Sequence, residues 1–207
     1  CEDNNGYLRT LGEYGEKDDY NYGLYYHFDY VGGPKTSMWI NTMPLQRTWD
    51  NMTTAYEYGV DDAWIVNVGD LKPMELPLTY FLDLAYDFET YGSSNPNSVD
   101  EYTKNWVKQQ FAADDLNEEE VQEIADILTG YTDMNGATKP ESLNAETHNI
   151  VNYNEVQRHL AEALRLEELA DKYLTKFENT ELYDAYYELV YYPAAATANL
   201  NQLWMYM

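Results

Sequence analysis

The chain has few cysteines and few basic residues, and each shortage excludes a class of protein. Cys1 is the only cysteine among 207 residues, so an internal disulfide framework and a cysteine metal site are both excluded. Lysine and arginine together number 12, against 37 aspartates and glutamates, which leaves a formal net charge of -25. Such a charge repels polyphosphates and anionic lipids. We therefore expect no nucleic-acid partner, no membrane partner and an acidic surface that mainly confers solubility.

Long apolar runs are also missing. No run of about 18 apolar residues occurs, so no transmembrane helix is encoded. The first five residues, Cys-Glu-Asp-Asn-Asn, do not have the basic segment followed by an apolar one that marks a signal peptide. The chain does not begin with methionine, and we expect it to be part of a longer protein. It also has no Gly-x-Ser-x-Gly elbow and no Walker loop, so two common enzyme classes are not indicated.

Two segments near the start have strand character and end at turn residues. The first, Leu24–Val31, is followed by Gly32-Gly33-Pro34, and the second, Ala63–Val68, is followed by Gly69. Between them, Pro44–Tyr58 has apolar residues at spacings of three and four, which is typical of a helix. A crossover helix is the economical way to join two parallel strands. The sequence therefore predicts a βαβ unit.

The rest of the chain has helical periodicity. A helix is expected from about Pro77 to Tyr91, and the turn residues of 92–97 end it. Further helices are predicted over 98–113, from an Asn117 cap to Gly130, and over 153–177, 181–192 and 194–207. The segment Tyr131–Ile150 is polar and contains Gly136 and Pro140, so it is expected to be a loop.

Several segments, taken in order, resemble a known family. They are Glu2–Tyr7, Tyr25–Pro34, Trp39–Thr42, Trp64–Glu75, Lys139–Glu141 and Tyr192–Asn201. The chain resembles glycoside hydrolase family 115, whose members remove glucuronic acid or its 4-O-methyl form from xylan. The resemblance implies an inverting hydrolase without a cofactor, a xylan-derived glucuronoside as substrate, and a secreted or periplasmic full-length protein. It also implies that the general acid is a glutamate upstream of Cys1, so the isolated chain is expected to be catalytically incomplete.

The fold class expected is α/β plus all-α, with helices dominant. Residues 1–92 are predicted to form the C-terminal part of a (β/α)8 TIM barrel, and residues 93–207 a truncated helical bundle. A barrel needs eight strands to close, and this chain supplies two or three. We therefore expect a strand edge and an apolar sheet face that the chain itself does not cover.

Polar residues at the ends of the predicted strands are the first candidates for a site, because ligands bind at the carboxyl ends of parallel strands. His27 is the only histidine in a patterned strand, and Tyr30 follows three residues later. A lone histidine is more often structural, but the resemblance implies that His27 and Tyr30 are both catalytic. Asn67 ends an apolar strand that we expect to be buried. An unpaired amide there is costly, so Asn67 must have partners within the fold or face a cavity. We predict that Asn67 is a functional amide and one of the catalytic residues.

The first residues form a second group of candidates. Strand alternation places Glu2 and Asn4 on one face and Asp3 on the other. The resemblance implies that this segment lines the site, with Glu2 and Asn4 catalytic and Asp3 in contact with substrate, although Glu2 stands where the family has an aspartate. A solvated turn ahead of Gly6 is the alternative.

A sugar acid needs a local cation in a chain with this net charge. Lys72 lies before a helix start, where an ammonium and a helix N-terminus together suit an anion. Alternatively, Lys72 pairs with Asp70 or Glu75. Lys35 stands where the family usually has an arginine, and it lacks the bidentate guanidinium. Asp70 and Trp39 complete the predicted substrate-binding residues.

The alternative hypothesis is a protein of a different class. In this hypothesis the chain is a noncatalytic acidic helical module for subunit contact or carbohydrate binding, which uses the aromatic residues Trp39, Trp204 and Tyr206. The apolar end, Leu203–Met207, needs a partner surface. We therefore expect a homodimer or contact with domains outside the chain. No histidine or carboxylate spacing typical of a metal site occurs, and no metal is predicted.

Overall fold

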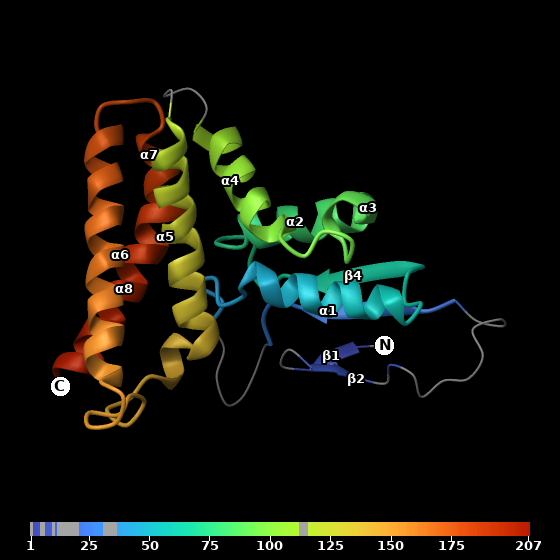
Figure 1. Ribbon diagram of the computed structural model, residues 1–207, viewed down its shortest axis with the longest axis horizontal. Coiled ribbons are helices and arrows are strands. Elements are labelled where there is room, and N and C mark those ends of the chain that lie inside the picture. Colours follow the sequence, from blue (N-terminus) through green and yellow to red (C-terminus); the bar gives the residue numbers. More distant parts are fainter. Residues whose placement is uncertain (1, 5–6, 10, 12–20, 31–36, 112–115) are drawn as a thin grey trace. The chain divides into compact units, whose positions relative to one another are not determined.

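The computed structural model describes residues 2–4, 7–9, 11, 21–30, 37–111 and 116–207 (Figure 1). It divides into two compact units. The sheet unit comprises Cys1–Trp39 and Met43–Tyr102, and the helical unit comprises Ile40–Thr42 and Thr103–Met207. Helices dominate and the sheet is small. The division falls within the helix α4, Ser98–Phe111; the boundary at residue 92, expected between parts of a larger barrel and a bundle, stays a prediction.

The sheet unit is built on four short strands. They are β1 (Glu2–Asn4), β2 (Tyr7–Arg9), β3 (Gly23–His27) and β4 (Ala63–Asn67), in the order β2-β1-β3-β4. The strand β3 pairs in parallel with both β1 and β4, and β2 runs antiparallel to β1. The helix α1, Leu45–Glu57, connects β3 to β4. The predicted βαβ unit is therefore confirmed, with each strand ending slightly earlier than the sequence pattern indicated.

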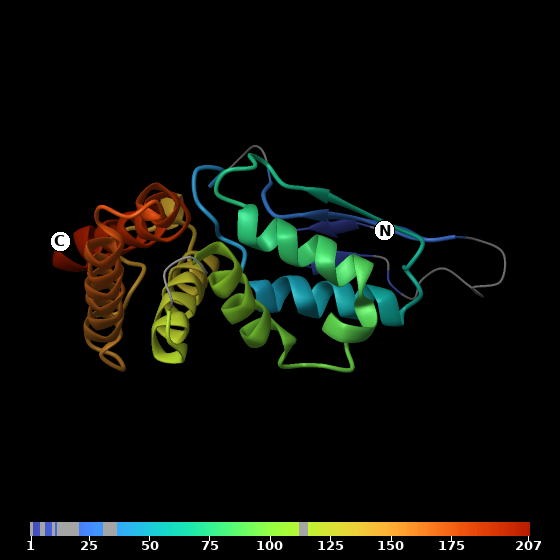
Figure 2. The ribbon, with the colours of Figure 1, turned by 90° about the horizontal axis from the view of Figure 1, so that it is seen from above.

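Helices cover one face of this sheet. Figure 2 shows α1 and α2, Glu75–Tyr86, on the same side of β3 and β4. Tyr26 and Phe28 point into this covered side, and the ring of Phe81 from α2 stacks on Tyr26 with 6.1 Å between centroids. The short helix α3, Phe88–Tyr91, follows α2 after a break at Asp87, whose side chain accepts a hydrogen bond from the Thr90 N–H. Alternate residues of β3 thus form the core of the unit.

The opposite face of the sheet is open within the described part of the chain. Tyr25 on β3 is 43% exposed, and Ile65 on β4 is 61% exposed. This confirms the expected uncovered face. The expectation that the second strand is buried was wrong, because β4 is an edge strand and only one of its faces packs against helices.

The helical unit contains most of the helices. They are the end of α4, α5 (Glu118–Ala137), the short 3-10 helix η2 (Pro140–Ser142), α6 (Glu155–Phe177), α7 (Tyr183–Tyr186), the π-helix η3 (Tyr187–Tyr191) and α8 (Tyr192–Tyr206). Phe111, Phe177 and Tyr186 are fully buried and form one aromatic cluster, with centroids 4.9 to 5.9 Å apart. In the part of the chain that the structure describes, no helix combines the length and apolar character needed to cross a membrane.

Two local predictions about α5 had opposite outcomes. The Asn117 cap is confirmed: its side chain accepts the Glu120 N–H at 3.0 Å, and Glu120 accepts the Asn117 N–H at 3.0 Å. The predicted loop from Tyr131 was wrong at its start, because α5 continues to Ala137. Gly130 does not end the helix. It allows close contact with α6, since a Cβ atom at Gly130 would lie 2.7 Å from Leu166 Cδ2.

A buried amide joins a short linking segment to the helical unit. The Asn135 side chain donates to the Asn41 carbonyl at 3.2 Å and to the Thr197 hydroxyl at 2.9 Å. Asn135 is 1% exposed, so these bonds satisfy an amide that would be costly to bury alone. They connect α5 and α8 to the segment Ile40–Thr42, which explains why these three residues belong to the helical unit.

Candidate active site at the carboxyl ends of the parallel strands

The last residues of β3 and β4 lie side by side. His27 and Asn67 are register partners in the parallel ladder, and the Phe28 N–H donates to the Asn67 carbonyl at 2.9 Å. Both strands therefore end at the same edge of the sheet. The predicted meeting of these two side-chain positions follows from parallel pairing, since a one-residue shift in register would move one of them to the other face.

A row of rings lies along β3 on the open face. The Tyr25 ring centroid is 4.3 Å from that of His27, and the Tyr30 ring stacks on His27 at 4.8 Å with an interplanar angle of 20°. His27 and Tyr30 are both half-buried. The imidazole is thus held between two phenol rings at the end of the strand. We call Tyr25, His27, Tyr30 and Asn67 the strand-end cluster.

The Asn67 side chain has one local partner and one remaining donor group. Its Oδ1 accepts the Gly69 N–H at 3.1 Å, which helps to shape the turn after β4. Gly69 has a φ of 76°, a left-handed conformation that glycine adopts without steric cost. The Asn67 NH₂ has no hydrogen-bond partner among the described residues. The amide can therefore support the turn through its oxygen and donate to a ligand through its nitrogen.

A buried carboxylate lies beside this turn, and sequence reasoning did not select it. Asp29 is 1% exposed, and its Oδ1 accepts the Ser37 N–H at 3.5 Å. A Cβ atom at Gly69 would lie 3.4 Å from Asp29 Cβ, so the two strand-end turns are packed against each other. The signal in the sequence was an acidic residue within an otherwise aromatic and apolar run. Such a residue is rarely buried without a specific role.

The remaining predicted substrate-binding residues lie in the loops after the strands. The Lys72 ammonium is 3.1 Å from Glu75 Oε1, which is one of the two arrangements considered above, and the Lys72 side chain is 64% exposed. Asp70 is exposed, and Trp39 is 42% exposed. Solvent therefore surrounds these groups more than it surrounds His27 or Tyr30.

The first strand brings the other predicted residues to the same sheet. Glu2 pairs with Tyr25 in the parallel ladder of β1 and β3, so Asn4 ends β1 at the carboxyl edge. Their backbone positions are described, and the roles of Glu2, Asp3 and Asn4 stay predictions. Cys1 and Lys35 lie outside the described residues.

The aromatic residues of the alternative hypothesis, a noncatalytic binding module, are distributed between the two units. Trp39 belongs to the sheet unit, whereas Trp204 and Tyr206 belong to α8 of the helical unit. Tyr206 is 68% exposed and Trp204 is half-buried. No single unit therefore carries all three. Within the described ranges, no group of three or more histidine, cysteine, aspartate or glutamate side chains has an arrangement suited to a metal ion.

Comparisons with known proteins agree on one family. A model of glycosyl hydrolase family 115 matches residues 1–142, a range that includes the strand-end cluster. A search of curated proteins found no match. A solved structure described as a family GH115 4-O-methyl-α-glucuronidase with specificity for decorated arabinogalactans, BtGH115A, superposes with a TM-score of 0.72 at 27% sequence identity. The match covers 89% of this chain and 25% of that one, so the chain spans a quarter of the length of its solved relative.

Proposed function

This chain belongs to glycosyl hydrolase family 115, and we propose that its strand-end cluster forms part of the active-site wall of an α-glucuronidase that removes glucuronic acid or its 4-O-methyl form from xylan. The observation that carries this proposal is the pairing of His27 with Asn67 at the ends of adjacent parallel strands, with Tyr30 stacked on the imidazole. Three hydrogen-bonding side chains thus lie at the edge where barrel enzymes have their active sites. The described activity of the similar solved protein supports a glucuronic acid residue as the sugar removed.

The reaction requires more groups than this chain supplies. In inverting hydrolysis, a water oxygen bonds to the anomeric carbon while the bond from that carbon to the leaving oxygen breaks. A general acid gives a proton to the leaving oxygen, and a base takes one from the water. The two carboxyl groups are typically about 6.5–9.5 Å apart. The resemblance implies that the general acid is a glutamate outside these residues, so the chain contributes orientation and hydrogen bonds.

Each member of the cluster suits a different part of this task. The His27 imidazole is oriented by the rings on either side and can donate an N–H to a sugar oxygen. The Asn67 NH₂ can donate to a hydroxyl or to the attacking water, because its Oδ1 is already bonded to Gly69. The Tyr30 hydroxyl is a third candidate donor. Glu2 and Asn4 are proposed to complete the wall from the neighbouring strand β1.

The negative charge of the chain makes recognition of the uronate carboxylate the most demanding step. Lys72 is exposed and already paired with Glu75, so its attraction for a sugar acid is screened by solvent and salt. Neutral donors avoid this difficulty. We propose that amide and imidazole donors orient the sugar, with Lys72 contributing mainly long-range attraction.

A direct test uses the complete protein with 4-O-methylglucuronoxylan and with a decorated arabinogalactan. Released uronic acid is measured by chromatography for the wild type, for His27→Ala and for His148→Ala, which removes a histidine from the helical unit. We expect the first variant to lose more than tenfold in turnover and the control to keep wild-type turnover. Unchanged release by a folded His27→Ala protein would contradict the proposed site.

The same assay, applied to the 207-residue chain alone, tests whether this chain contains all the groups that the reaction needs. We expect no measurable release of glucuronic acid, because the proposed general acid is not among these residues. Robust turnover by the chain alone would show that one of its own carboxyl groups, such as Asp29 or Glu75, is the acid.

A further inference from the structure

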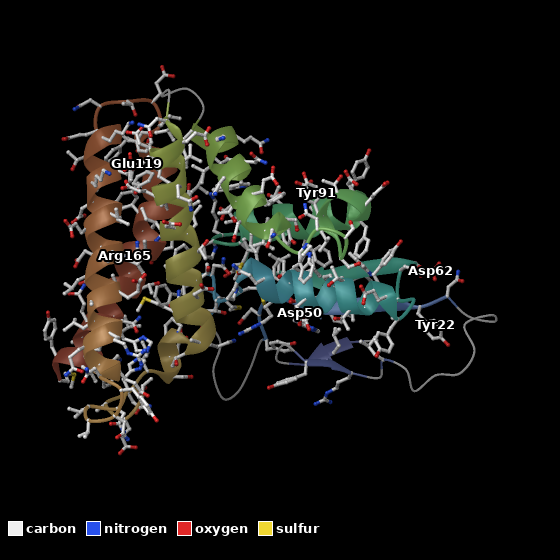
Figure 3. All side chains as sticks on the ribbon, viewed as in Figure 1. Tyr22, Asp50, Asp62, Tyr91, Glu119 and Arg165 are labelled. Atoms are coloured by element: carbon white, nitrogen blue, oxygen red, sulfur yellow. The ribbon has the colours of Figure 1, made fainter. Side chains whose placement is uncertain are left out.

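The helices α5 and α6 are in contact at Gly130 and leave an open cavity beside it. A Cβ atom at Gly130 would lie 2.7 Å from Leu166 Cδ2. The two helices diverge toward the segment that connects them (Figure 1). Arg165, labelled in Figure 3, belongs to α6, and its Nη2 lies 2.6 Å from Oε1 of Glu162, which lines the cavity. Gly130 is the first of the α5 residues that line this space, and Ala137 is the last.

This space, which we call the α5–α6 cavity, is formed by the helical unit alone. Its volume is about 370 Å³, and its lining residues are Gly130, Asp133, Met134, Ala137, Arg158, His159 and Glu162. Small-molecule pockets typically have volumes of about 300–1,000 Å³. The cavity is therefore large enough for a ligand of monosaccharide size, and too small for an extended polysaccharide.

The charged groups around the cavity are not equally available. Glu162 is bound by Arg165, whose two guanidinium nitrogens lie 2.6 and 3.0 Å from its carboxylate oxygens. Arg158, in contrast, has no ion pair among the described residues, although the chain has 37 acidic residues against 12 basic ones. It is in the first turns of α6, where the helix dipole also favours a negative charge. An available guanidinium is the preferred partner for a carboxylate, because it can form two parallel hydrogen bonds.

A second side chain beside Arg158 is held in position. The His159 ring stacks on His148 with 4.0 Å between centroids and an interplanar angle of 28°. This contact orients an imidazole at the cavity wall. Met134 and Ala137 supply an apolar surface on the opposite helix, and the exposed Asp133 also lines the cavity. The cavity therefore combines an apolar side, a cation, an imidazole and a carboxylate acceptor.

We infer that the α5–α6 cavity is a second carbohydrate-binding site, which holds a single uronic acid residue with its carboxylate on Arg158. The apolar face of the sugar ring lies against Met134 and Ala137, and its hydroxyl groups donate to Asp133. We infer an anionic ligand because Arg158 lines the cavity. That this anion is a uronic acid and not another small carboxylate rests on the proposed function. No bond is made or broken in this site.

The test is calorimetric titration of sodium glucuronate into the chain carrying Asn67→Ala, which weakens the strand-end site. In this background we expect one binding event per chain. Adding Arg158→Met should weaken it at least tenfold, and adding Arg158→Lys should weaken it less. Lys104→Met is the matched control, because Lys104 is also a cation without an ion pair among the described residues and belongs to the same unit. It should leave the affinity unchanged.

The outcomes separate this inference from the proposed function. If Arg158→Met abolishes glucuronate binding, the second site is supported. If Asn67→Ala alone does not change the affinity of the chain for glucuronate, that result counts against the strand-end site. Equal affinity in the Asn67→Ala background with and without Arg158→Met would overturn the second site. Equal affinity for glucuronate and neutral methyl glucoside would overturn the role of Arg158 as the carboxylate partner. Since Arg158 is exposed, its replacement should not change the melting temperature, which serves as the check on folding.

Discussion

His27 and Asn67 are paired across β3 and β4, and the main-chain bond from Phe28 N–H to the Asn67 carbonyl, 2.9 Å long, fixes this pairing at the carboxyl edge of the sheet. The two side chains therefore have positions set by strand register, while the turns that follow them supply the neighbouring groups. A site built on paired strands is more rigid than one built on loops. Such rigidity would allow two residues 40 positions apart to contact one ligand, as proposed.

Replacing Asn67 by alanine in the complete enzyme should lower turnover by more than tenfold. The amide donor to sugar or water is lost, and a tenfold change corresponds to about 1.4 kcal/mol of transition-state stabilisation. Steady-state kinetics on a glucuronoside measures the effect. The melting temperature should change little, because the bond to Gly69 lies in an exposed turn.

Asn67→Asp separates the two roles of this amide. Aspartate keeps an oxygen for the Gly69 N–H but has no NH₂ group, so the turn should be retained and turnover should still fall. If Asn67→Ala and the aspartate variant lose stability and activity in parallel, the residue is a structural partner of the turn and not a ligand donor.

Gly69→Ala should destabilise the protein. The φ of 76° at this position costs an L-residue roughly 1–2 kcal/mol. The added Cβ would also contact Asp29 Cβ at 3.4 Å. Chemical denaturation measures the loss. Asparagine tolerates this conformation better than alanine, so Gly69→Asn should lose less stability, and Asp70→Ala in the same loop should lose almost none. A neutral Gly69→Ala would show that the turn can change its conformation without cost.

Lys72→Met in the complete enzyme should weaken uronate binding more than Lys35→Met, and added salt should reduce the Lys72 deficit. The second expectation follows from the structure, because the Lys72 side chain is 64% exposed and exposed charges are screened within about 8 Å at physiological ionic strength. Titration calorimetry with glucuronic acid at low and high salt provides the measurement. A deficit that does not change with salt would place Lys72 in a desolvated contact with the sugar in the complete protein.

The βαβ unit was predictable because its periodicity changes along the chain. Apolar residues recur at spacings of three and four in α1, so the burial of Met52 follows from pattern alone. In β3 the adjacent Tyr25 and Tyr26 have the same side chain, and only Tyr26 is buried. The pairing of His27 with Asn67 required one further step, the rule that crossover helices join parallel strands. Both inferences use only residues close together in the sequence, so they do not depend on the rest of the protein.

Other features depended on packing that no local pattern contains. Gly130 was taken as a helix end, yet it is retained inside α5 because the Leu166 side chain occupies the space beside it. The apolar residues of β4 indicated burial, although Ile65 lies on a face that no described residue covers. Asp29 was not chosen because its burial depends on the turn at Gly69, which belongs to another strand.

The stacked histidines of the helical unit should make its stability depend on pH. Burial lowers the pKa of His148 below its ordinary value of 6.5, and His159 lowers this pKa further, while the Glu155 carboxylate partly offsets both. The Arg158 guanidinium, the Glu162 carboxylate and the Asp133 carboxylate also line the neighbouring cavity. As the pH falls through about 6.5, the unfolded chain binds a proton at His148 before the folded chain does. The free energy of unfolding should therefore fall, and the loss should be complete below the folded-state pKa.

His148→Gln should remove this part of the acid sensitivity. Thermal unfolding at pH values between about 7 and 5 measures the acid sensitivity. Over this range, the melting temperature of the wild type should fall further than that of the variant. Glu155→Gln is the informative control. It keeps an oxygen for the Asn149 N–H, which Glu155 accepts at 2.7 Å, but removes the charge that favours protonated His148, so its acid sensitivity should exceed that of the wild type. Identical losses in all three proteins would show that other groups control the response to acid.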